Sequence, residues 1–413
     1  MLTHAVVLMY LYGMKRKPKG GQAQVGSLFL LKETFDNFLE HGIMADRALQ
    51  DTFRKYKLRD ERIRAELARR FYGIIRSWRP LTSALGMDEF NTVKEIGLLV
   101  GTWNNWRKIY HGEKPAETSA VTDRLEKYMR VRKLRESFPD WLDARCESEL
   151  GAEWETIAHA LNTEAPIFLR TNQLKITREM LLKKLREEGF SIQPAENEEG
   201  ILVEGYQHVF ASPSFKDGLF EVQDLSSQKV APFLNVEPGM RVADACAGSG
   251  GKTIHLAALM QNRGKIVAMD VSAKKLEELR KRCIRSGADL VEIRPVDSAK
   301  RMEETFDRVL LDVPCSGTGV LRRNPDIRWR LTPENLESMI AEQQQILQTY
   351  SSLVKTGGRL VYATCSILPS EGEDQIQKFL SGGKSWELEQ ETRIDPSKSP
   401  GDGFYFARLK KNA

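Results

Sequence analysis

The sequence of 413 residues predicts an α/β protein in which a doubly wound parallel sheet follows two smaller domains. Apolar runs alternate with helical patterns from about residue 224 onward, a β-α-β pattern with further strands occupies 166–223, and helical periodicity extends from 28 to about 136. We expect the following division of the chain: a flexible segment 1–27, a helical domain 28–145, an α+β domain 151–226 and the sheet domain 227–413.

The helical domain combines an apolar face with positive surfaces. Leu67, Phe71 and Ile74 recur at helical spacing. Basic residues occupy two stretches of this domain: Arg62, Arg64, Arg69 and Arg70, and then Arg124, Lys127, Arg130, Arg132, Lys133 and Arg135. The formal net charge of the chain is +5, and the whole positive excess lies in residues 1–150. Such a bundle suits a polyanionic partner such as RNA, or it only keeps the protein in solution.

The α+β domain begins with a strand pattern at 166–172. A helix over 178–188 follows, and further strands are expected at 190–193, 202–204 and 220–223. One β-α-β unit followed by more strands predicts a ferredoxin-like fold. Arg170 and Asn172 lie at the end of the first strand and could contact phosphate, although isolated polar residues there are more often structural.

The sheet domain places acids and one cysteine where its strands end. Its strands are expected at 241–246, 265–270, 291–296, 307–313 and 358–364. Ligands of doubly wound sheets bind at the carboxyl ends of the strands. These ends carry Asp244, Asp270, Asp297, Asp312 and Cys365, which we therefore expect to converge on one site.

A glycine-rich turn joins the first of these strands to the helical pattern that follows it. The stretch 243–253 reads Ala-Asp-Ala-Cys-Ala-Gly-Ser-Gly-Gly-Lys-Thr, and glycines let a ligand approach the backbone at a helix N-terminus. It is not a phosphate-binding P-loop, because Cys246 stands where that pattern needs glycine. An acid at the tip of the second strand, Asp270, suits a ribose diol. The ligand is then a dinucleotide or S-adenosylmethionine.

Cysteine usage and the N-terminus indicate the compartment. Five cysteines without paired spacing predict neither a disulfide framework nor a metal site, which fits a reducing cytoplasm. The apolar run 5–12 is too short to span a bilayer, and basic residues follow it rather than precede it, the reverse of a signal peptide. We expect a cytoplasmic monomer with no membrane association, whose first residues are disordered or misassigned, with Met14 as a possible start.

Cys315 and Cys365 stand at the tips of two strands that we expect to be neighbours. Singly, each is more often an inert buried thiol, but two beside a nucleoside site indicate chemistry. A thiolate that attacks C6 of a pyrimidine makes C5 nucleophilic, and C5 can then take a methyl group from a sulfonium. Asp312 is placed to donate to N3 of the ring if burial raises its pKa, and a second cysteine could help to release the product.

The motifs closely resemble those of the Sun-type (Nol/Nop/Sun) RNA cytosine-5 methyltransferases. The similar stretches are Asp-Ala-Cys-Ala-Gly-Ser-Gly-Gly-Lys-Thr, Leu-Asp-Val-Pro-Cys-Ser-Gly-Thr-Gly and Tyr-Ala-Thr-Cys-Ser, with 322–326 and 401–405 as further matches. The resemblance covers about residue 166 to the end and implies a Rossmann-like S-adenosylmethionine-dependent fold. It implies that Cys365 attacks the cytosine and that Cys315 assists release, whereas DNA enzymes attack with the Pro-Cys thiol.

The same resemblance implies which residues hold S-adenosylmethionine. Carried onto this sequence, they are Cys246, Ala247, Gly248, Ser249, Gly250, Gly251, Lys252, Asp270, Asp297 and Asp312. Asp270 would bind the ribose, Asp297 would lie on the adenine side, and Asp312 would lie between cofactor and base. Ser249 is a departure, since many members have proline there. The N-terminal helices resemble, more weakly, the NusB-like RNA-binding domain of bacterial ribosomal RNA members.

RNA recognition would need an extruded or unpaired cytosine. Four arginines follow the Pro-Cys motif and could hold flanking phosphates, namely Arg322, Arg323, Arg328 and Arg330. Trp329 could stack on a base, although such a residue is more often packed beside a helix.

The resulting hypothesis is 5-methylcytosine formation in RNA, with 16S ribosomal RNA as the favoured target and transfer RNA as an alternative. A ribosome-assembly or RNA-binding factor without catalysis is a second reading, and the retention of both Cys315 and Cys365 counts against it. A methyltransferase for a small molecule or protein would need neither two thiols nor basic accessory domains. A nicotinamide dehydrogenase fits least, because the glycine turn lacks its fingerprint.

Overall fold

The computed structural model describes residues 26–205, 207–383 and 385–412. The prediction for segment 1–27, Met14 included, falls almost wholly outside the described residues. The chain forms two compact units, one of residues up to 145 together with 324–330, and the other of residues 146–323 and 331 onward. Within the described residues, no helix has the length and apolar character needed to cross a membrane.

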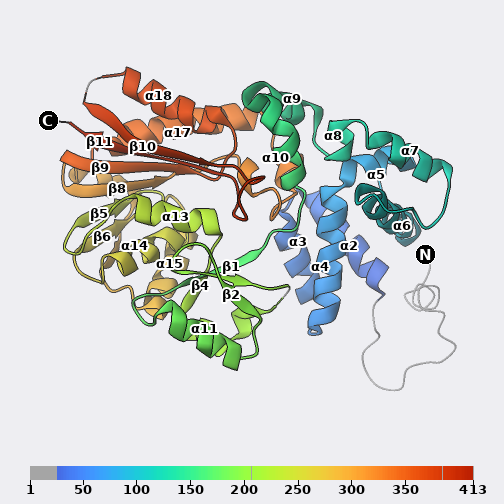
Figure 1. The fold of residues 1–413 in the computed structure, drawn as a ribbon, viewed down its shortest axis with the longest axis horizontal. Helices are drawn as coiled ribbons and strands as arrows, with labels where there is room; N and C mark the ends of the chain where they lie inside the picture. The colour runs from blue at the N-terminus through green and yellow to red at the C-terminus, as the bar shows by residue number, and fades with distance from the viewer. Residues whose placement is uncertain (1–25, 206, 384, 413) are drawn as a thin grey trace. The chain divides into compact units, whose positions relative to one another are not determined.

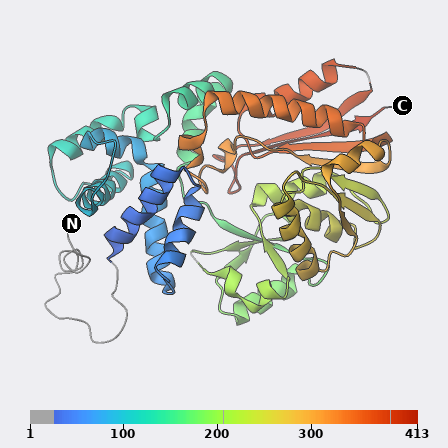
Figure 2. The ribbon, with the colours of Figure 1, turned by 180° about the vertical axis from the view of Figure 1, so that it is seen from behind.

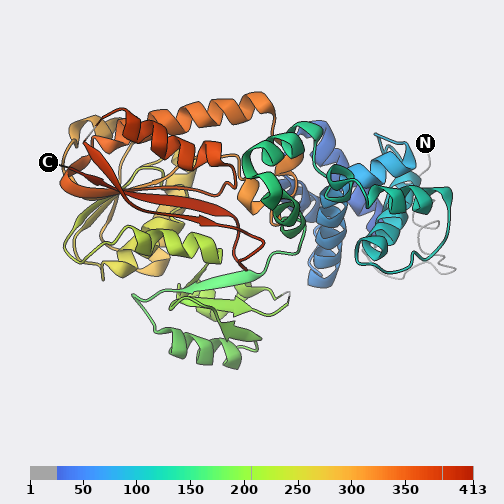
Figure 3. The same ribbon diagram turned by 45° about the horizontal axis from the view of Figure 1, so that its top comes forward.

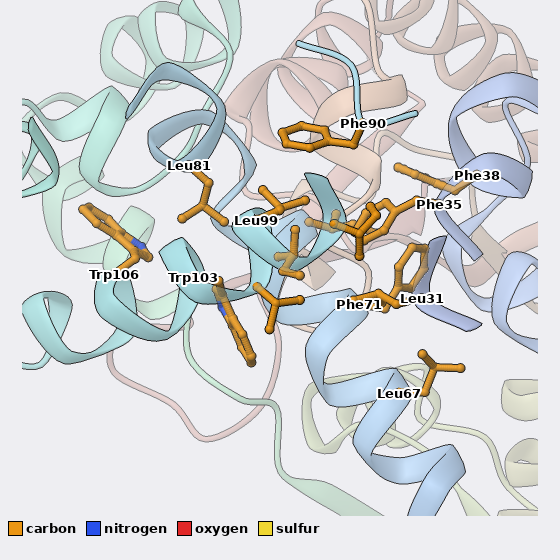
Figure 4. Close-up of a cluster of buried hydrophobic side chains, with 14 of the residues drawn as sticks. Leu31, Phe35, Phe38, Leu67, Phe71, Leu81, Phe90, Leu99, Trp103 and Trp106 are labelled. Atoms are coloured by element: carbon orange, nitrogen blue, oxygen red, sulfur yellow. The ribbon is translucent and has the colours of Figure 1, made fainter. Parts of the chain in front are cut away.

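The first unit is helical, as the periodicity predicts. Its helices are α2 (Ser27–His41), α3 (Ala45–Lys55), α4 (Glu61–Arg76), α5 (Trp78–Leu85), α6 (Val93–Tyr110), α7 (Ala120–Tyr128) and α8 (Arg132–Arg135). Thr92 and Glu95 form a capping box at the start of α6 and satisfy backbone N–H groups there. Figure 4 shows the core, in which Phe35, Phe71 and Leu99 are buried among side chains of α2, α4 and α6. Burial of this shared apolar face holds the helices together.

A short segment of the second half of the chain, 324–330, belongs to this helical unit and contains α16 (Ile327–Arg330). Arg328 is fully buried, lies over the Phe138 ring at 4.3 Å and donates to the carbonyl oxygens of Glu136 and Ser137 at 2.9 and 3.2 Å. Trp329 donates its indole N–H to the Ile75 carbonyl at 2.9 Å. The interpretation of Arg328 as a phosphate contact is therefore wrong, because its guanidinium satisfies carbonyls inside the unit.

The second unit begins with α9 (Asp140–Leu150), which crosses the boundary, followed by η1 (Gly151–Glu153) and α10 (Trp154–Ala160). A four-stranded antiparallel sheet comes next, with β1 (Ile167–Thr171), β2 (Ile192–Pro194), β3 (Gly200–Val203) and β4 (Phe220–Val222) in the order β2-β3-β1-β4. Helix α11 (Arg178–Glu187) packs on β2 and β3, and η2 (Val209–Ala211) and α12 (Pro213–Lys216) precede β4. Figure 3 shows α11 on one face of this sheet, and the strand order confirms a ferredoxin-like fold.

A seven-stranded sheet forms the rest of the second unit. Its strands are β5 (Arg241–Asp244), β6 (Lys265–Ala268), β7 (Val291–Ile293), β8 (Phe306–Asp312), β9 (Val354–Thr364), β10 (Trp386–Ile394) and β11 (Phe404–Lys411), in the order β10-β11-β9-β8-β5-β6-β7. Helices α13 (Leu225–Phe233), α14 (Gly251–Leu259) and α15 (Ala273–Ser286) cover one face, and α17 (Pro333–Ser351) and α18 (Glu373–Ser381) cover the other (Figures 1 and 2). The Rossmann-like architecture is confirmed.

The sheet departs from the predicted all-parallel arrangement at one edge. β5 to β9 pair in parallel, but β11 runs antiparallel to both β9 and β10. β10 is an edge strand with mostly exposed or half-buried residues, so it carries no apolar run that would reveal it in the sequence. The order of the parallel strands reverses between β5 and β8, which puts the ligand crevice at the tips of these two strands.

Candidate functional site

The glycine-rich turn leaves β5 at Asp244 and enters α14 through Gly250. Gly250 has φ +90°, and a Cβ at this position would lie 2.0 Å from Leu279 Cδ1 of α15, so only glycine fits. Gly248 also has a left-handed conformation, with φ +55°, and a Cβ there would meet no described atom within 4 Å. The turn therefore presents open backbone on one side and close packing on the other.

Asp270 lies beside the turn, two residues after the end of β6. Its Oδ2 accepts from the Gly248 N–H at 2.9 Å and its Oδ1 from the Ser272 N–H at 2.8 Å. Each oxygen keeps a lone pair for a hydroxyl group, as a ribose diol requires. Asp297 is exposed in η3 (Val296–Arg301), beyond β7, rather than directly at the strand tip. The open backbone at Gly248 and the acceptor set of Asp270 fit a nucleoside such as that of S-adenosylmethionine.

Asp244 is a buried acid beneath the turn. The carboxylate accepts from the Thr253 hydroxyl at 2.7 Å, and burial raises the pKa of Asp244 to about 7. Cys246 lies within the predicted strand 241–246, but β5 ends at Asp244, so Cys246 belongs to the turn; burial raises the pKa of the Cys246 thiol well above its ordinary value. Cys246 thus contributes its backbone to the turn rather than a reactive thiolate.

Asp312 and Lys252 connect the turn to the tip of β8. Lys252 Nζ lies 2.6 Å from Asp312 Oδ2, and its side chain is only 10% exposed whereas that of Asp312 is 32% exposed. The ammonium also lies over the Phe404 ring, 5.5 Å from its centroid. The pair therefore holds the carboxylate at the crevice with a cation on its buried side.

Cys315 and Cys365 are in contact, with their Sγ atoms 3.3 Å apart. They come from the loops after β8 and β9, which are parallel neighbours in the sheet. The hydrogen bond to Cys365 and burial raise the pKa of Cys315 well above its ordinary value, so Cys315 stays protonated. The structure thus brings together the two thiols that the sequence analysis paired.

The stretch 401–405 packs against the loops that carry the two cysteines. A Cβ on Gly319 would lie 2.0 Å from the Gly403 carbonyl oxygen and 2.8 Å from that of Cys365, so Gly319 must remain glycine. Its N–H donates to the Cys365 carbonyl at 3.0 Å, and Gly403 N–H donates back to Gly319 O at 2.9 Å. The stretch 401–405 is therefore part of the cysteine site's frame.

Arg322 and Arg323 belong to this frame and not to a phosphate-binding surface. Arg322 is 5% exposed and its Nε lies 2.7 Å from Asp402 Oδ1. Arg323 bridges Asp402 and Asp224, with Nη2 at 2.7 Å from Asp224 Oδ2. Arg330, in the helical unit, is paired with Asp326 at 3.1 Å. The hypothesis that these arginines hold RNA phosphates is wrong for Arg322 and Arg323, since buried carboxylates already bind them.

Glu371 is a functional candidate that the sequence analysis missed. It is fully buried in η5 (Pro369–Glu371), and its carboxylate accepts from Ser316 N–H at 2.8 Å, from the Ser316 hydroxyl, from Ser366 Oγ at 2.6 Å and from Gln343 Nε2 at 2.9 Å. In sequence, Pro-Ser-Glu-Gly resembles an exposed turn. The only signal was its position six residues after Cys365.

The ferredoxin-like domain supports the glycine turn directly. Arg170 of β1 is 2% exposed and donates to the Gly251 carbonyl at 2.8 Å, and Gln223 also accepts from it. Arg282 of α15 donates to both Ser249 O and Ser249 Oγ at 3.0 Å, and its other nitrogen lies 2.8 Å from Glu221 of β4. Arg170 is thus a structural residue, and Ser249 uses its hydroxyl where proline would have none.

The fold is the Rossmann-like fold of S-adenosylmethionine-dependent methyltransferases, and the glycine turn with Asp270 fits the nucleoside of that cofactor. Residues 231–410 match the family described as 16S rRNA methyltransferase RsmB/F, and residues 138–209 match the ferredoxin-like domain of RsmF/B-like methyltransferases.

Similar proteins agree with these matches. A probable ribosomal RNA small subunit methyltransferase B of Synechocystis is 38% identical over 298 residues, covering 67% of each chain. Its counterpart in Pasteurella multocida is 36% identical, covering 66% of this chain and 65% of the relative, so the matched region spans about two thirds of the relatives' length. Among solved structures, PH0851 is 26% identical with a TM-score of 0.76, covering 95% of this chain and 100% of that one. A methyltransferase homolog from Pyrococcus horikoshii is 28% identical with a TM-score of 0.61, covering 69% and 99%. The chain belongs to the RsmB/F family.

Proposed function

We propose that this chain methylates C5 of a cytosine in 16S ribosomal RNA, with S-adenosylmethionine as methyl donor and a covalent Cys365–cytosine adduct as intermediate. The observation that carries the proposal is the contact of two thiols, 3.3 Å apart, at the tips of parallel neighbours β8 and β9, with the Asp312–Lys252 pair on the same side. The names of the relatives supply ribosomal RNA as the target class.

The reaction begins when the Cys365 thiolate forms a bond to C6 of the cytosine. The electron pair of the C5–C6 double bond moves into the ring, and a proton at N3 neutralises it. The structure does not bury Asp312 as a proton donor would require: its side chain is 32% exposed and its carboxylate accepts from the Lys252 ammonium at 2.6 Å. We therefore assign the N3 proton to the Lys252 ammonium, with the Asp312 carboxylate passing it to the ring. S-adenosylmethionine supplies an electrophilic methyl group and leaves as the neutral thioether.

Release requires loss of the C5 proton to a base and cleavage of the C6–sulfur bond, which returns the electron pair to Cys365; the N3 proton returns to the Asp312–Lys252 pair. A hydrogen bond to the departing thiolate lowers the barrier for this cleavage. Cys315 is the donor we assign, since its pKa is raised and its Sγ lies 3.3 Å from that of Cys365. This role for Cys315 explains why two thiols are needed where one would suffice for attack.

We assign RNA docking to the helical domain 28–145, a NusB-like domain by its order of helices. Its α4 carries Arg62, Arg69 and Arg70, of which Arg69 and Arg70 pair with Glu66 on the same helix. The target base must be unpaired or extruded, because C5 and C6 are covered in a stacked helix. We place the reaction in the cytoplasm, where the five free cysteines stay reduced, and expect a monomer.

The test is covalent trapping with Cys315→Ala, produced in cells and treated with nuclease before a denaturing gel. We expect an RNA-linked species of lower mobility that disappears in the Cys315→Ala/Cys365→Ala double variant, while the Cys283→Ala control shows none. Sequencing of the trapped RNA distinguishes 16S ribosomal RNA from transfer RNA. If Cys365→Ala alone traps RNA, the roles of the thiols are reversed. If neither variant traps RNA while S-adenosylmethionine still binds, the chain is an assembly factor.

A further inference from the structure

The residues that follow the two cysteines share one partner. Ser316 comes directly after Cys315 and Ser366 directly after Cys365, and both hydroxyls donate to the carboxylate of Glu371. The backbone N–H of Ser316 donates to the other oxygen of that carboxylate at 2.8 Å. One side chain therefore ties the loop after β8 to the loop after β9, one residue beyond each thiol.

Helix α17 strengthens this tie. Gln343 is fully buried and donates to Glu371 Oε1 and to the Pro314 carbonyl, both at 2.9 Å. The Tyr362 hydroxyl donates to the Glu371 backbone carbonyl at 2.9 Å. Pro314 directly precedes Cys315, so the Cys315 loop is fixed on both sides of its thiol.

A buried carboxylate of this kind is unusual, because burial of a charge is unfavourable unless hydrogen bonds or a cation compensate it. Glu371 is fully buried, and no ion pair joins it among the described residues. Four donors from Ser316, Ser366 and Gln343 compensate the charge instead. Apolar residues would hold two loops at a lower desolvation penalty, so the acid has a purpose other than stability alone.

We propose that Glu371 is a positioning residue for the methylation reaction. Its carboxylate holds the Cys315 and Cys365 loops at a fixed separation, so that the two thiols remain in contact. The inference rests on the proposed function, since it concerns the rate of thiol attack and release. Glu371 itself is fully buried and acts through the two loops rather than on the substrate. An error of about 1 Å in the placement of a reacting group can lower a rate by about 10²-fold. Loss of the tie therefore acts on kcat and leaves the affinity for RNA unchanged.

Two substitutions distinguish the hydrogen bonds that Glu371 makes to the two loops from its negative charge. Glu371→Ala removes the acceptor and leaves the Ser316 N–H, both hydroxyls and the Gln343 amide without it. Glu371→Gln keeps the shape, because its carbonyl oxygen can accept and its amide can donate to the serine hydroxyls. Asp374→Asn is the matched control, since Asp374 is an exposed acid three residues further along.

The first readout is thiol proximity, measured without RNA or S-adenosylmethionine. Dibromobimane becomes fluorescent when it bridges two thiols, and peptide mass spectrometry identifies the Cys315–Cys365 bridge. We expect Glu371→Ala to lower the yield of this bridge several-fold, while Glu371→Gln and Asp374→Asn stay near the wild-type yield. The second readout is steady-state methylation, in which Glu371→Ala lowers kcat by about 10²-fold with KM for RNA unchanged and Glu371→Gln restores much of kcat.

Wild-type bridge yield and kcat in Glu371→Ala would overturn the inference. So would an equal loss in Glu371→Gln, which would show that the charge and not the tie is needed. If Glu371→Ala does not fold by circular dichroism, Ser366→Ala replaces it, and unchanged bridging and kcat there would equally overturn the inference. Retained methylation in Cys365→Ala would instead refute the proposed function, while the bridging assay would still report the geometry of the loops.

Discussion

The two halves of the site are held in different ways. On the cofactor half, cations support the glycine turn: Arg170 binds the Gly251 carbonyl, Arg282 binds Ser249, and Lys252 binds Asp312. On the cysteine half, hydroxyl and amide groups surround the carboxylate of Glu371, and no described cation pairs with it. Cations thus hold the glycine turn, whereas neutral dipoles hold the carboxylate that joins the two cysteine loops; ion pairs of Arg322 and Arg323 with Asp402 occur only in the surrounding frame.

This difference matches the chemistry of each half. A cation next to two thiols would lower the pKa of both and remove the distinction between nucleophile and donor. The carboxylate of Glu371, which neutral donors and no cation compensate, has the opposite sign of effect and is one of the lesser causes that raise the pKa of Cys315. On the cofactor half no thiol reacts, so arginines can hold carbonyl groups without affecting the reaction.

The largest effect is expected where the halves meet, at Lys252. Lys252→Met removes the cation behind Asp312 while keeping the length of the side chain. Loss of positioned proton transfer lowers a rate by 10²–10⁴-fold, so we expect kcat to fall by about 10³-fold. Single-turnover methylation measures it, with Lys265→Met as the control because Lys265 pairs with Glu292 outside the site. A fall of less than about fivefold, well below the range expected of a positioned acid, would contradict the role of the pair.

Asp244 is an exception within the cofactor half, because a hydroxyl and not a cation binds this buried acid. Its substitution shows whether stability there depends on charge. Its pKa is about 7 in the folded state and about 4 in an unfolded chain, so between these values the folded state binds more protons. Stability must therefore fall as pH rises from about 4 to 7, and Asp244→Asn must remove that part of the slope.

As pH rises from 5 to 8, we expect the free energy of unfolding of Asp244→Asn to gain about 2–3 kcal/mol relative to that of the wild type. Denaturant unfolding of both proteins at several pH values measures it, without S-adenosylmethionine. Asp289→Asn is the control, since Asp289 is exposed. A difference that is independent of pH would show that Asp244 is ionised in the folded protein.

Arg282 tests the support that the ferredoxin-like domain gives to the turn. Arg282→Gln breaks the link from Glu221 through the guanidinium to Ser249. Hydrogen bonds to charged groups contribute about 1.5–3 kcal/mol, and the Arg282 side chain is 18% exposed, so we expect KM for S-adenosylmethionine to rise about tenfold. Arg280→Gln is the control because Arg280 pairs with Glu277 on the outer face of α15. An unchanged KM would show that the turn is rigid without the ferredoxin-like domain.

The sequence predicts the parts of the site that are local. The turn at 243–253 and the loops around Cys315 and Cys365 carry their chemistry in consecutive residues, and strand alternation places them at one edge. Glu371 could not be found in this way, because its role depends on Ser316, which is 55 residues away. Parallel strands bring such distant residues together only after the sheet has formed.

The arginines also show that contacts between residues distant in sequence cannot be predicted from the sequence. Arg322 and Arg328 look like phosphate contacts in a sequence, because clustered arginines are the usual sign of nucleic-acid binding. Their partners, Asp402 for Arg322 and the Glu136 and Ser137 carbonyls for Arg328, are 80 and about 190 residues distant. The number of positive charges is visible in a sequence, whereas the acid or carbonyl that binds each one is not.

The smallest effect is expected at Ser249, where a substitution tests a single hydrogen bond of the glycine turn. Ser249→Ala removes the hydroxyl that Arg282 binds but keeps the carbonyl that Arg282 also binds. One such bond contributes about 0.5–1.5 kcal/mol, so we expect KM for S-adenosylmethionine to rise about threefold with kcat unchanged. Isothermal titration with S-adenosylmethionine measures the same change as an affinity. Ser249→Pro should give the same modest rise, because proline has no hydroxyl but also keeps the carbonyl. A loss larger than that of Arg282→Gln would mean that the hydroxyl acts on the cofactor directly rather than through the arginine.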